Sequence, residues 1–110
     1  MPIQLMPQEL LRRAAERFRL LAEPVRLELL NHLHVDGELT VSELVARTGY
    51  NQANVSKHLL LMAAEGLLRR RKDGLHVYYA IADPTLAGLC VLVCSQVNQP
   101  EETASTDLVE

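Results

Sequence analysis

The stretch TVSELVARTGYNQANVSKHLLLMAAEGLL, residues 40–68, decides the fold of this chain. Thr40 is a predicted N-cap, and Glu43 three residues later completes a capping box. Gly49 is typical of the residue that follows a helix, and Asn51 then caps a second helix. Two short helices joined by so tight a turn form a helix-turn-helix, which we place at about 40–48 and 51–65.

Periodic segments on both sides extend this unit. Upstream, apolar residues recur at three- and four-residue spacing, which predicts two helices. Downstream, two segments rich in strand formers flank Asp73-Gly74, a strong signal for a two-residue hairpin. A last helix begins at Asp83-Pro84. The sequence therefore predicts a mainly α winged helix-turn-helix, with four helices, a β-hairpin wing and a last helix at about 7–21, 24–36, 40–48, 51–65, 67–81 and 83–98.

Acidic residues are concentrated at the C-terminal end. The net charge is −3 over 110 residues, but four of the 14 acidic side chains lie in the last twelve residues: Glu101, Glu102, Asp107 and Glu110. The rest of the chain holds 11 basic and 10 acidic side chains. We expect one winged helix-turn-helix domain, residues 1–98, followed by an acidic disordered tail, residues 99–110.

Composition disfavours several classes of protein. No apolar run approaches the roughly 18 residues of a membrane span, and the N-terminal segment lacks the pattern of a signal peptide. Two cysteines are too few for a disulfide scaffold of the secreted kind. There is also no Gly-rich phosphate loop and no pairing of a nucleophile with a base. We expect a cytoplasmic protein that neither enters a membrane nor acts as an enzyme.

The second helix of the helix-turn-helix carries the side chains expected to read DNA. Such a helix lies in the major groove with its N-terminal residues toward the base edges. Amide side chains pair with adenine, and lysine meets guanine or phosphate. The alternative is an ordinary solvated helix face, which the scarcity of Asp and Glu there disfavours. The predicted base-reading residues are Asn51, Gln52, Asn54, Ser56, Lys57 and His58.

The predicted wing carries a run of basic residues before its tip and a histidine after it. Alternate residues of a strand face opposite sides, so about half of these bases share one face. Directly after a recognition-type helix, such a face suits phosphates beside the groove. The alternative is a solvated edge strand protected by charge. The predicted wing contacts are Arg69, Arg70, Arg71, Lys72 and His76.

The last predicted helix is apolar on nearly every side, which a surface helix of a small monomer cannot satisfy. We expect a second copy to cover it about a two-fold axis, with the first helix joining in. The alternative is burial within its own monomer. A homodimer places two recognition helices one DNA turn apart, which suits a palindromic operator. The predicted interface residues are Leu11, Phe18, Leu86, Leu89, Cys90, Val93 and Val97.

Three segments together resemble the ArsR/SmtB family of winged-helix repressors, over roughly residues 10–98. They are LAEPVRLELLNHL (21–33), LTVSELVARTGYNQANVSKHLLLMAAEGLL (39–68) and RRRKDGLHVYYAI (69–81). The first is similar to the family's second helix, and the second to its recognition helix. The resemblance implies a homodimer that binds an operator, blocks transcription and is released when an effector binds.

The effector sites of the best-known branches of that family are not matched. The arsenic-sensing branch has Cys-x-Cys in the third helix, where this chain has Thr40-Val41-Ser42. The zinc-sensing branch has Asp, His and Glu ligands along the last helix, where this chain has Asp83-Pro84-Thr85, then Gln96 and Gln99. The second helix holds no cysteine, which the persulfide-sensing branches require.

Cys90 and Cys94 remain as candidate sensing residues. Being four residues apart, they lie on one face of the last helix. They could bind a soft ion such as arsenite, Cu(I) or Zn(II), react with an oxidant or reactive sulfur, or oxidise between subunits. The alternative is that both are small buried hydrophobes. We predict a dimeric repressor released by a thiol-reactive inducer, against a repressor without a sensor site or a module for protein contact.

Overall fold

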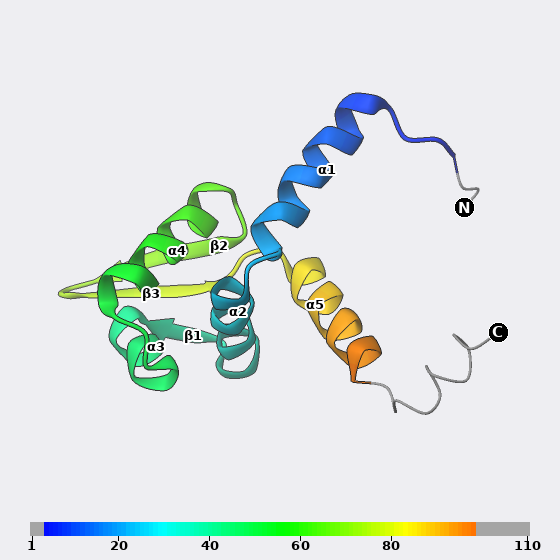
Figure 1. Ribbon diagram of the computed structural model, residues 1–110. Coiled ribbons are helices and arrows are strands. Elements are labelled where there is room, and N and C mark those ends of the chain that lie inside the picture. The colour runs from blue at the N-terminus through cyan, green and yellow to red at the C-terminus, as the bar shows by residue number, and fades with distance from the viewer. Residues whose placement is uncertain (1–3, 99–110) are drawn as a thin grey trace.

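A computed structural model describes residues 4–98 of the chain, so the predicted acidic tail lies outside the described residues. The elements follow the predicted order, with one strand added (Figure 1). They are α1 (Gln8–Leu21), α2 (Pro24–Asp36), β1 (Glu38–Thr40), α3 (Val41–Thr48), α4 (Gln52–Ala64), β2 (Leu68–Asp73), β3 (His76–Ile81) and α5 (Pro84–Val97). Over this described part, no helix is both long and apolar enough to cross a membrane.

The local signals that define the helix-turn-helix are confirmed. Thr40 Oγ1 accepts a hydrogen bond from the Glu43 backbone N–H at 3.1 Å, and Glu43 Oε1 accepts from the Thr40 backbone N–H at 2.8 Å. This capping box pairs donors that the start of a helix otherwise leaves unpaired. Gly49 ends α3 with a φ of 80°, a left-handed conformation that favours glycine. Asn51 Oδ1 accepts from the Asn54 N–H at 2.7 Å and begins α4.

The sheet contains a strand that the sequence analysis did not predict. β1 pairs antiparallel with β3, whose other neighbour is β2, so the strand order is β1-β3-β2. With three residues, β1 is too short to show a period-two pattern. The hairpin turn also lies one residue later than expected, because Asp73 pairs with His76 and leaves Gly74-Leu75 as the loop. Gly74 has a φ of 63°, as the first loop residue of a type II′ turn requires.

An aliphatic core joins α2, α3 and α4 to the sheet. The predicted stripe of α4 is confirmed, because Val55, Leu59 and Met62 are fully buried. Tyr79 of β3 is the largest side chain among them, and its ring is also buried. The other members are Leu21, Leu29, Leu30, Leu33, Leu39, Leu44, Leu67, Leu68 and Leu86. The core therefore packs the helix-turn-helix against the base of the wing, whereas the rest of β2 is exposed.

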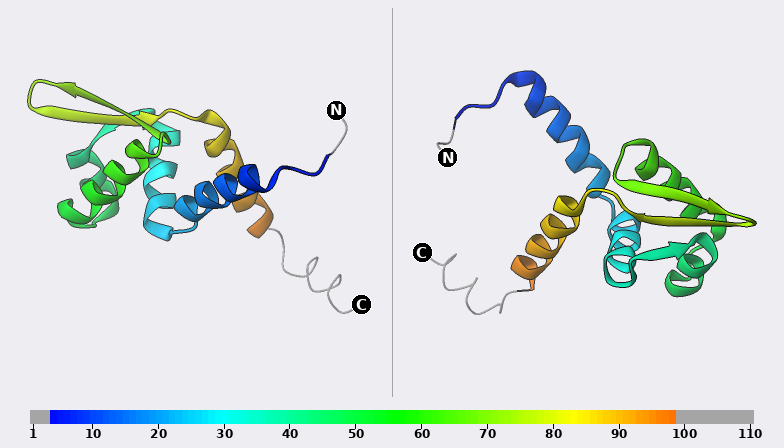
Figure 2. Two further views of the ribbon diagram at one scale, coloured as in Figure 1. Left: turned by 90° about the horizontal axis from the view of Figure 1, so that it is seen from above. Right: turned by 180° about the vertical axis from the view of Figure 1, so that it is seen from behind.

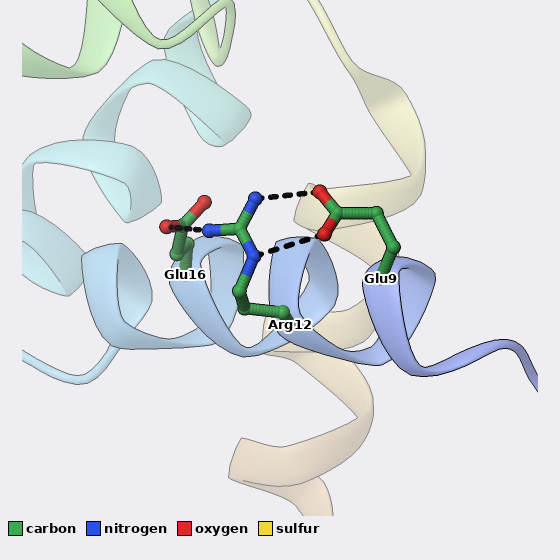
Figure 3. Close-up of polar contacts among 3 residues, drawn as sticks. All are labelled: Glu9, Arg12 and Glu16. Atoms are coloured by element: carbon green, nitrogen blue, oxygen red, sulfur yellow. Dashed lines mark hydrogen bonds and ion pairs between the residues drawn. The ribbon is translucent and has the colours of Figure 1, made fainter.

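α1 projects from this core and buries only Leu21 (Figure 1). Its polar side is held by an ion cluster (Figure 3). Arg12 Nη2 lies 2.6 Å from Glu9 Oε2, and Arg12 Nη1 lies 2.7 Å from Glu16 Oε2. Pairs at these spacings stabilise a helix without help from the core. α1 is thus supported locally while its apolar side stays exposed.

The elements divide between two ends of the molecule (Figures 1 and 2). α3, α4 and the wing, which is the β2–β3 hairpin, lie at one end, and α1 and α5 lie at the other. The tip of the wing projects beyond the helices beside it. A partner can therefore contact the helix-turn-helix and the wing without touching the apolar faces of α1 and α5.

Candidate nucleic-acid interface

The outer face of α4 carries most of the polar side chains expected to read DNA. Gln52 and Lys57 are exposed, while Asn54 and Ser56 are half-buried at the flanks of this face. Asn51 is exposed, but its side-chain oxygen already caps α4. Gln52 and Lys57 are therefore the predicted residues best placed to enter a groove.

His58, which was expected to be exposed on that face with the other DNA-reading residues, is buried, so the predicted exposure is wrong. The residue is 8% exposed, because one position beyond Lys57 turns the side chain by about 100° around the helix, toward the core stripe at Val55. Arg26 Nε donates to His58 Nδ1 at 3.1 Å, and Arg26 Nη1 donates to the Leu20 carbonyl at 3.0 Å. His58 thus fixes α4 to α2 instead of facing outward.

Glu23 completes this part-buried cluster. Its Oε2 accepts a hydrogen bond from the Arg26 backbone N–H at 3.1 Å, which caps α2, and lies 3.9 Å from His58 Nε2. Burial opposes ionisation of Glu23, but the N–H groups of Arg26 and Val25, and then the neighbouring Arg26 side chain, outweigh it and lower its pKa. The role of Arg26 was not predictable from the sequence, because capping and periodicity do not show which side chain a half-buried arginine contacts.

The turn between α3 and α4 is also tied to α2. Tyr50 Oη donates to Glu28 Oε1 at 2.7 Å. This hydrogen bond raises the pKa of Tyr50, because an ionised phenol would lose the bond and face a carboxylate. This pair was not predictable from the sequence, since two polar residues 22 positions apart leave no periodic signal. Together with the Arg26–His58 contact, the pair sets the position of α4 on α2.

The basic residues of the wing lie on both faces of the hairpin. Arg70 pairs across the ladder with Tyr79 and lies on the core side of the sheet, where its Nε donates to Tyr79 Oη at 3.2 Å. By the alternation of strand residues, Lys72 shares that side nearer the tip, and Arg69 lies on the other. Arg69, Arg70, Lys72 and His76 are all exposed, so each can approach a phosphate.

Arg71 differs from these bases because it is paired with carboxylates on its own face of the sheet. Its Nε and Nη2 donate to Glu38 Oε2 and Oε1 at 3.0 and 2.9 Å. Its Cζ lies 4.4 Å from the centroid of the Tyr78 ring, and its Nη1 lies 3.7 Å from Asp73 Oδ2. The hydrogen bond from Arg71 lowers the pKa of Glu38. The guanidinium therefore has a carboxylate near each of its three nitrogens.

Large apolar side chains are exposed on α1 and α5, at the end opposite the wing. The exposed fractions of four predicted interface residues are Leu11 54%, Phe18 57%, Val93 53% and Val97 80%. Leu86, in contrast, is 8% exposed and belongs to the core of its own monomer. Leu86, which was expected at the interface, thus packs within its own monomer, because the first turn of α5 lies against the core and the later turns project. Leu89 and Cys90 are half-buried beside the same core.

Cys90 and Cys94 line an apolar pocket between α2 and α5. The pocket has a volume of about 430 Å³, and Leu27, Leu30 and His34 form part of its other wall. Cys90 is half-buried and Cys94 is exposed. Burial, and then the neighbouring Cys94 thiol, raises the pKa of Cys90. Within residues 4–98, no three His, Cys, Asp or Glu side chains gather as a metal site.

Comparisons with known proteins place this arrangement among DNA-binding proteins. A family model described as a helix-turn-helix domain matches residues 21–71. The chain is also 40% identical over 78 residues to the probable mercury resistance operon repressor of Streptomyces lividans. That match covers 71% of this chain and 62% of the relative. The chain thus spans less than two thirds of that relative's length.

Two solved structures share the fold. The AntR antimony-specific transcriptional repressor matches with a TM-score of 0.82 and 28% identity, covering 96% of this chain and 92% of that one. The homodimeric winged helix-turn-helix DNA-binding domain of a possible ArsR-family transcriptional regulator from Mycobacterium bovis matches with a TM-score of 0.73 and 31% identity. Here the coverage is 89% of this chain and 91% of that one. These likenesses confirm the predicted winged helix-turn-helix.

Proposed function

Because the chain belongs to the ArsR/SmtB family of winged helix-turn-helix proteins, we propose that it is a DNA-binding transcriptional repressor of the cytoplasm. One observation carries the proposal: α4, which carries the exposed Gln52 and Lys57, lies at the same end of the molecule as the basic wing (Figure 1). A helix-turn-helix uses its second helix to read the major groove. The three relatives described above are all named as repressors or transcriptional regulators, which supports a regulator over an enzyme.

On this proposal, α4 lies in the major groove and the wing lies over the neighbouring backbone. The Gln52 amide suits adenine, and Lys57 suits guanine or a phosphate. Asn51, Asn54 and Ser56 flank them. Phosphate contacts fix the register of the protein on the duplex without reading sequence, and the proposed contacts are Arg69, Arg70, Lys72 and His76.

The proposed repressor is a homodimer joined through α1 and α5. Exposed aliphatic side chains on both helices form an apolar surface that a soluble monomer rarely leaves in water. The Mycobacterium bovis relative is described as homodimeric, which supports the same assembly here. A two-fold axis would present two copies of α4 to successive turns of DNA and favour a palindromic operator. The proposed interface comprises Leu11, Phe18, Val93 and Val97, with Leu89 and Cys90 at its edge.

The proposed inducer reacts with Cys90 and Cys94. Thiolates favour soft ions, and the relatives named for mercury and antimony support a soft metal or metalloid such as arsenite, Cu(I) or Zn(II). Two thiols of one helix supply two ligands, and residues 4–98 gather no cluster of three. A metal ion that needs more than two ligands would take the others from the second copy. An oxidant would instead link or modify the thiols.

The proposed route from inducer to DNA runs through α5. Cys90 lies between the core of its own monomer and the exposed apolar turns of α5. A ligand held there would act on how α5 packs against α2 and against the partner. An inducer releases DNA only if it binds more tightly to the arrangement that does not fit the operator, so the two α4 helices would change their separation or angle.

Fluorescence anisotropy of a duplex from the region upstream of the protein's own gene tests the DNA-binding function. Titration at two salt concentrations should give binding that weakens steeply at the higher one, because contacts to phosphates release counterions. Lack of binding at the lower salt concentration would contradict the function. It would favour the alternative of a module for protein contact.

A double variant, Cys90→Ser with Cys94→Ser, tests the sensing site. It should bind the same duplex as the wild type does, but it should resist release by arsenite, Cu(I), Zn(II) and a thiol oxidant. At least one of these agents should release the wild type. A double variant that is released like the wild type, or a wild type that none of them releases, would contradict sensing at these cysteines.

A further inference from the structure

We propose that Arg71 is a positioning residue, which holds the wing at a fixed angle to the helix-turn-helix and makes no phosphate contact itself. The inference rests on the proposed DNA-binding function and divides the basic residues of the wing by role. Arg71 differs from its neighbours by its two hydrogen bonds to Glu38, at 2.9 and 3.0 Å. It also differs by lying over the ring of Tyr78.

The side chain of Arg71 crosses the whole sheet. Arg71 is on β2, and its ladder partner Tyr78 is on the central strand β3. Glu38 is on β1, on the far side of β3, where it pairs with Ala80. Neighbouring strands lie about 4.8 Å apart, so an arginine that reaches Glu38 must lie flat over β3. The guanidinium 4.4 Å above the Tyr78 ring meets this requirement.

This crossing ties the wing to β1, the strand that leads into the helix-turn-helix. β1 ends at Thr40, which is also the N-cap of α3. β1 pairs with β3 over three residues, from Glu38 to Thr40, so the ladder alone gives the hairpin a short attachment. The Arg71–Glu38 pair adds a link between the outer strands. The angle between the wing and α3 is therefore set by a side chain as well as by the ladder.

The same contacts leave Arg71 poorly suited to a phosphate. Its three nitrogens lie near Glu38 and Asp73, at 2.9 to 3.7 Å. Turning to DNA would break the two-point pair with Glu38 and leave that carboxylate beside a polyanion. Lys72 follows Arg71 directly and is exposed on the opposite face of the strand. Lys72 is therefore the matched control, with the same charge and a different proposed role.

The salt dependence of DNA binding separates the two roles. The wild type, Arg71→Ala and Lys72→Ala are each titrated with a labelled random-sequence duplex of about 30 base pairs over a series of NaCl concentrations. The plot of log K against log [NaCl] has a negative slope, and loss of one phosphate contact makes this slope shallower by about one. We expect this change for Lys72→Ala. Arg71→Ala should keep the wild-type slope and weaken binding about three- to tenfold, because a looser wing must be ordered on binding.

Glu38→Gln provides the partner test. It should weaken binding like Arg71→Ala, although it removes a negative charge. The variant with both substitutions should bind no more weakly than either single variant, because both remove one shared link. If Arg71 instead contacts phosphate, Glu38→Gln would release Arg71 and strengthen DNA binding. Arg71→Ala would then show a shallower dependence of log K on log [NaCl] than the wild type. Either result would overturn the inference.

An NMR measurement on the wild type covers the case in which a variant fails to fold. The Nε–H signal of Arg71, held on Glu38, should keep its chemical shift when the random duplex is added. A large shift of this signal would overturn the inference while leaving DNA binding itself intact. A wild type that shows no salt-dependent binding would overturn the proposed function, and the inference with it.

Discussion

The Nε–H group of Arg26 donates a hydrogen bond to Nδ1 of His58 over 3.1 Å and joins the first turn of α2 to the middle of α4. Because an arginine Nε–H can only donate, Nδ1 is the acceptor and the ring proton lies on Nε2, 3.9 Å from Glu23 Oε2. The same guanidinium binds the Leu20 carbonyl at the end of α1. Three helices therefore meet at one side chain, behind the face proposed to read DNA.

Replacing His58 should destabilise the fold more than replacing its neighbour Lys57. His58→Ala leaves a part-buried Arg26 donor without its acceptor, at a cost of about 1–3 kcal/mol in the free energy of unfolding. Lys57→Ala changes an exposed position and should stay within about 0.5 kcal/mol of the wild type. Urea unfolding followed by circular dichroism measures both. Equal losses from the two variants would contradict the buried role of His58.

Replacing Lys57 should weaken DNA binding, whereas replacing His58 should lower the stability of the fold. Lys57→Ala removes a positive charge from the outer face of α4, so it should weaken binding to duplex DNA and flatten its salt dependence. Arg13→Ala is the charge-matched control, because Arg13 is exposed on α1, at the end of the molecule opposite the wing, and lies outside the Arg12 ion cluster that supports this helix (Figure 3). The control variant should bind DNA with the affinity of the wild type. Equal weakening by both variants would indicate a general effect of charge and no defined interface.

A charge placed on α5 should separate the dimer. Val93 is 53% exposed in the single chain, and Val93→Asp would bury a carboxylate in the proposed interface. Leu75→Asp makes a comparable change at the wing tip, where the side chain is 99% exposed. In analytical ultracentrifugation, Val93→Asp should sediment as a monomer and Leu75→Asp as a dimer. A dimeric Val93→Asp variant would contradict an interface at this position.

The capping box should make the stability of α3 depend on pH. The backbone N–H of Thr40, and less strongly its side chain, lowers the pKa of Glu43 in the folded protein. Because this pKa is lowered, ionised Glu43 stabilises the fold at pH values above about 4.3, the usual pKa of glutamate. This contribution is lost as the pH falls through the lower pKa that Glu43 has in the folded protein. Thermal unfolding should show Glu43→Gln less stable than the wild type near neutral pH, with the difference shrinking in acid. A difference that stays constant over this range would contradict the assignment.

The two thiols should differ in reactivity. Cys94 is exposed, whereas burial and the Cys94 thiol raise the pKa of half-buried Cys90. Since the thiolate is the reactive form, iodoacetamide should label Cys94 first, and labelling of Cys90 should accelerate at higher pH. Peptide mass spectrometry at timed intervals gives both rates. Faster labelling of Cys90 at neutral pH would contradict this order and indicate a different environment.

The helix-turn-helix could be predicted from the sequence because its signals are local. The Thr40–Glu43 capping box and Gly49 each act within four residues, and the structure confirms them. The α4 stripe at Val55, Leu59 and Met62 follows from the 3.6-residue period alone. β1 was not predictable in the same way, because its three residues are strand-like only through pairing with β3.

The residues misassigned from sequence share one physical cause. His58 follows other polar residues on α4, and Leu86 lies on α5, which is apolar on nearly every side. In both helices, the sequence pattern does not show where the buried face ends. His58 is polar but lies within the α4 stripe, and Leu86 is apolar but packs on its own core. The Arg71–Glu38 link joins residues 33 positions apart, and only the tertiary fold brings them together.

Comparison of specific with random DNA tests the central claim most directly. The affinity of the full chain is measured at physiological salt for a duplex from the region upstream of its own gene, and for a shuffled duplex of equal length and composition. A sequence-specific repressor should bind the first at least about a thousandfold more tightly, with two copies per duplex. Equal affinity for both duplexes would contradict the account, because the basic wing would then serve only to hold any DNA.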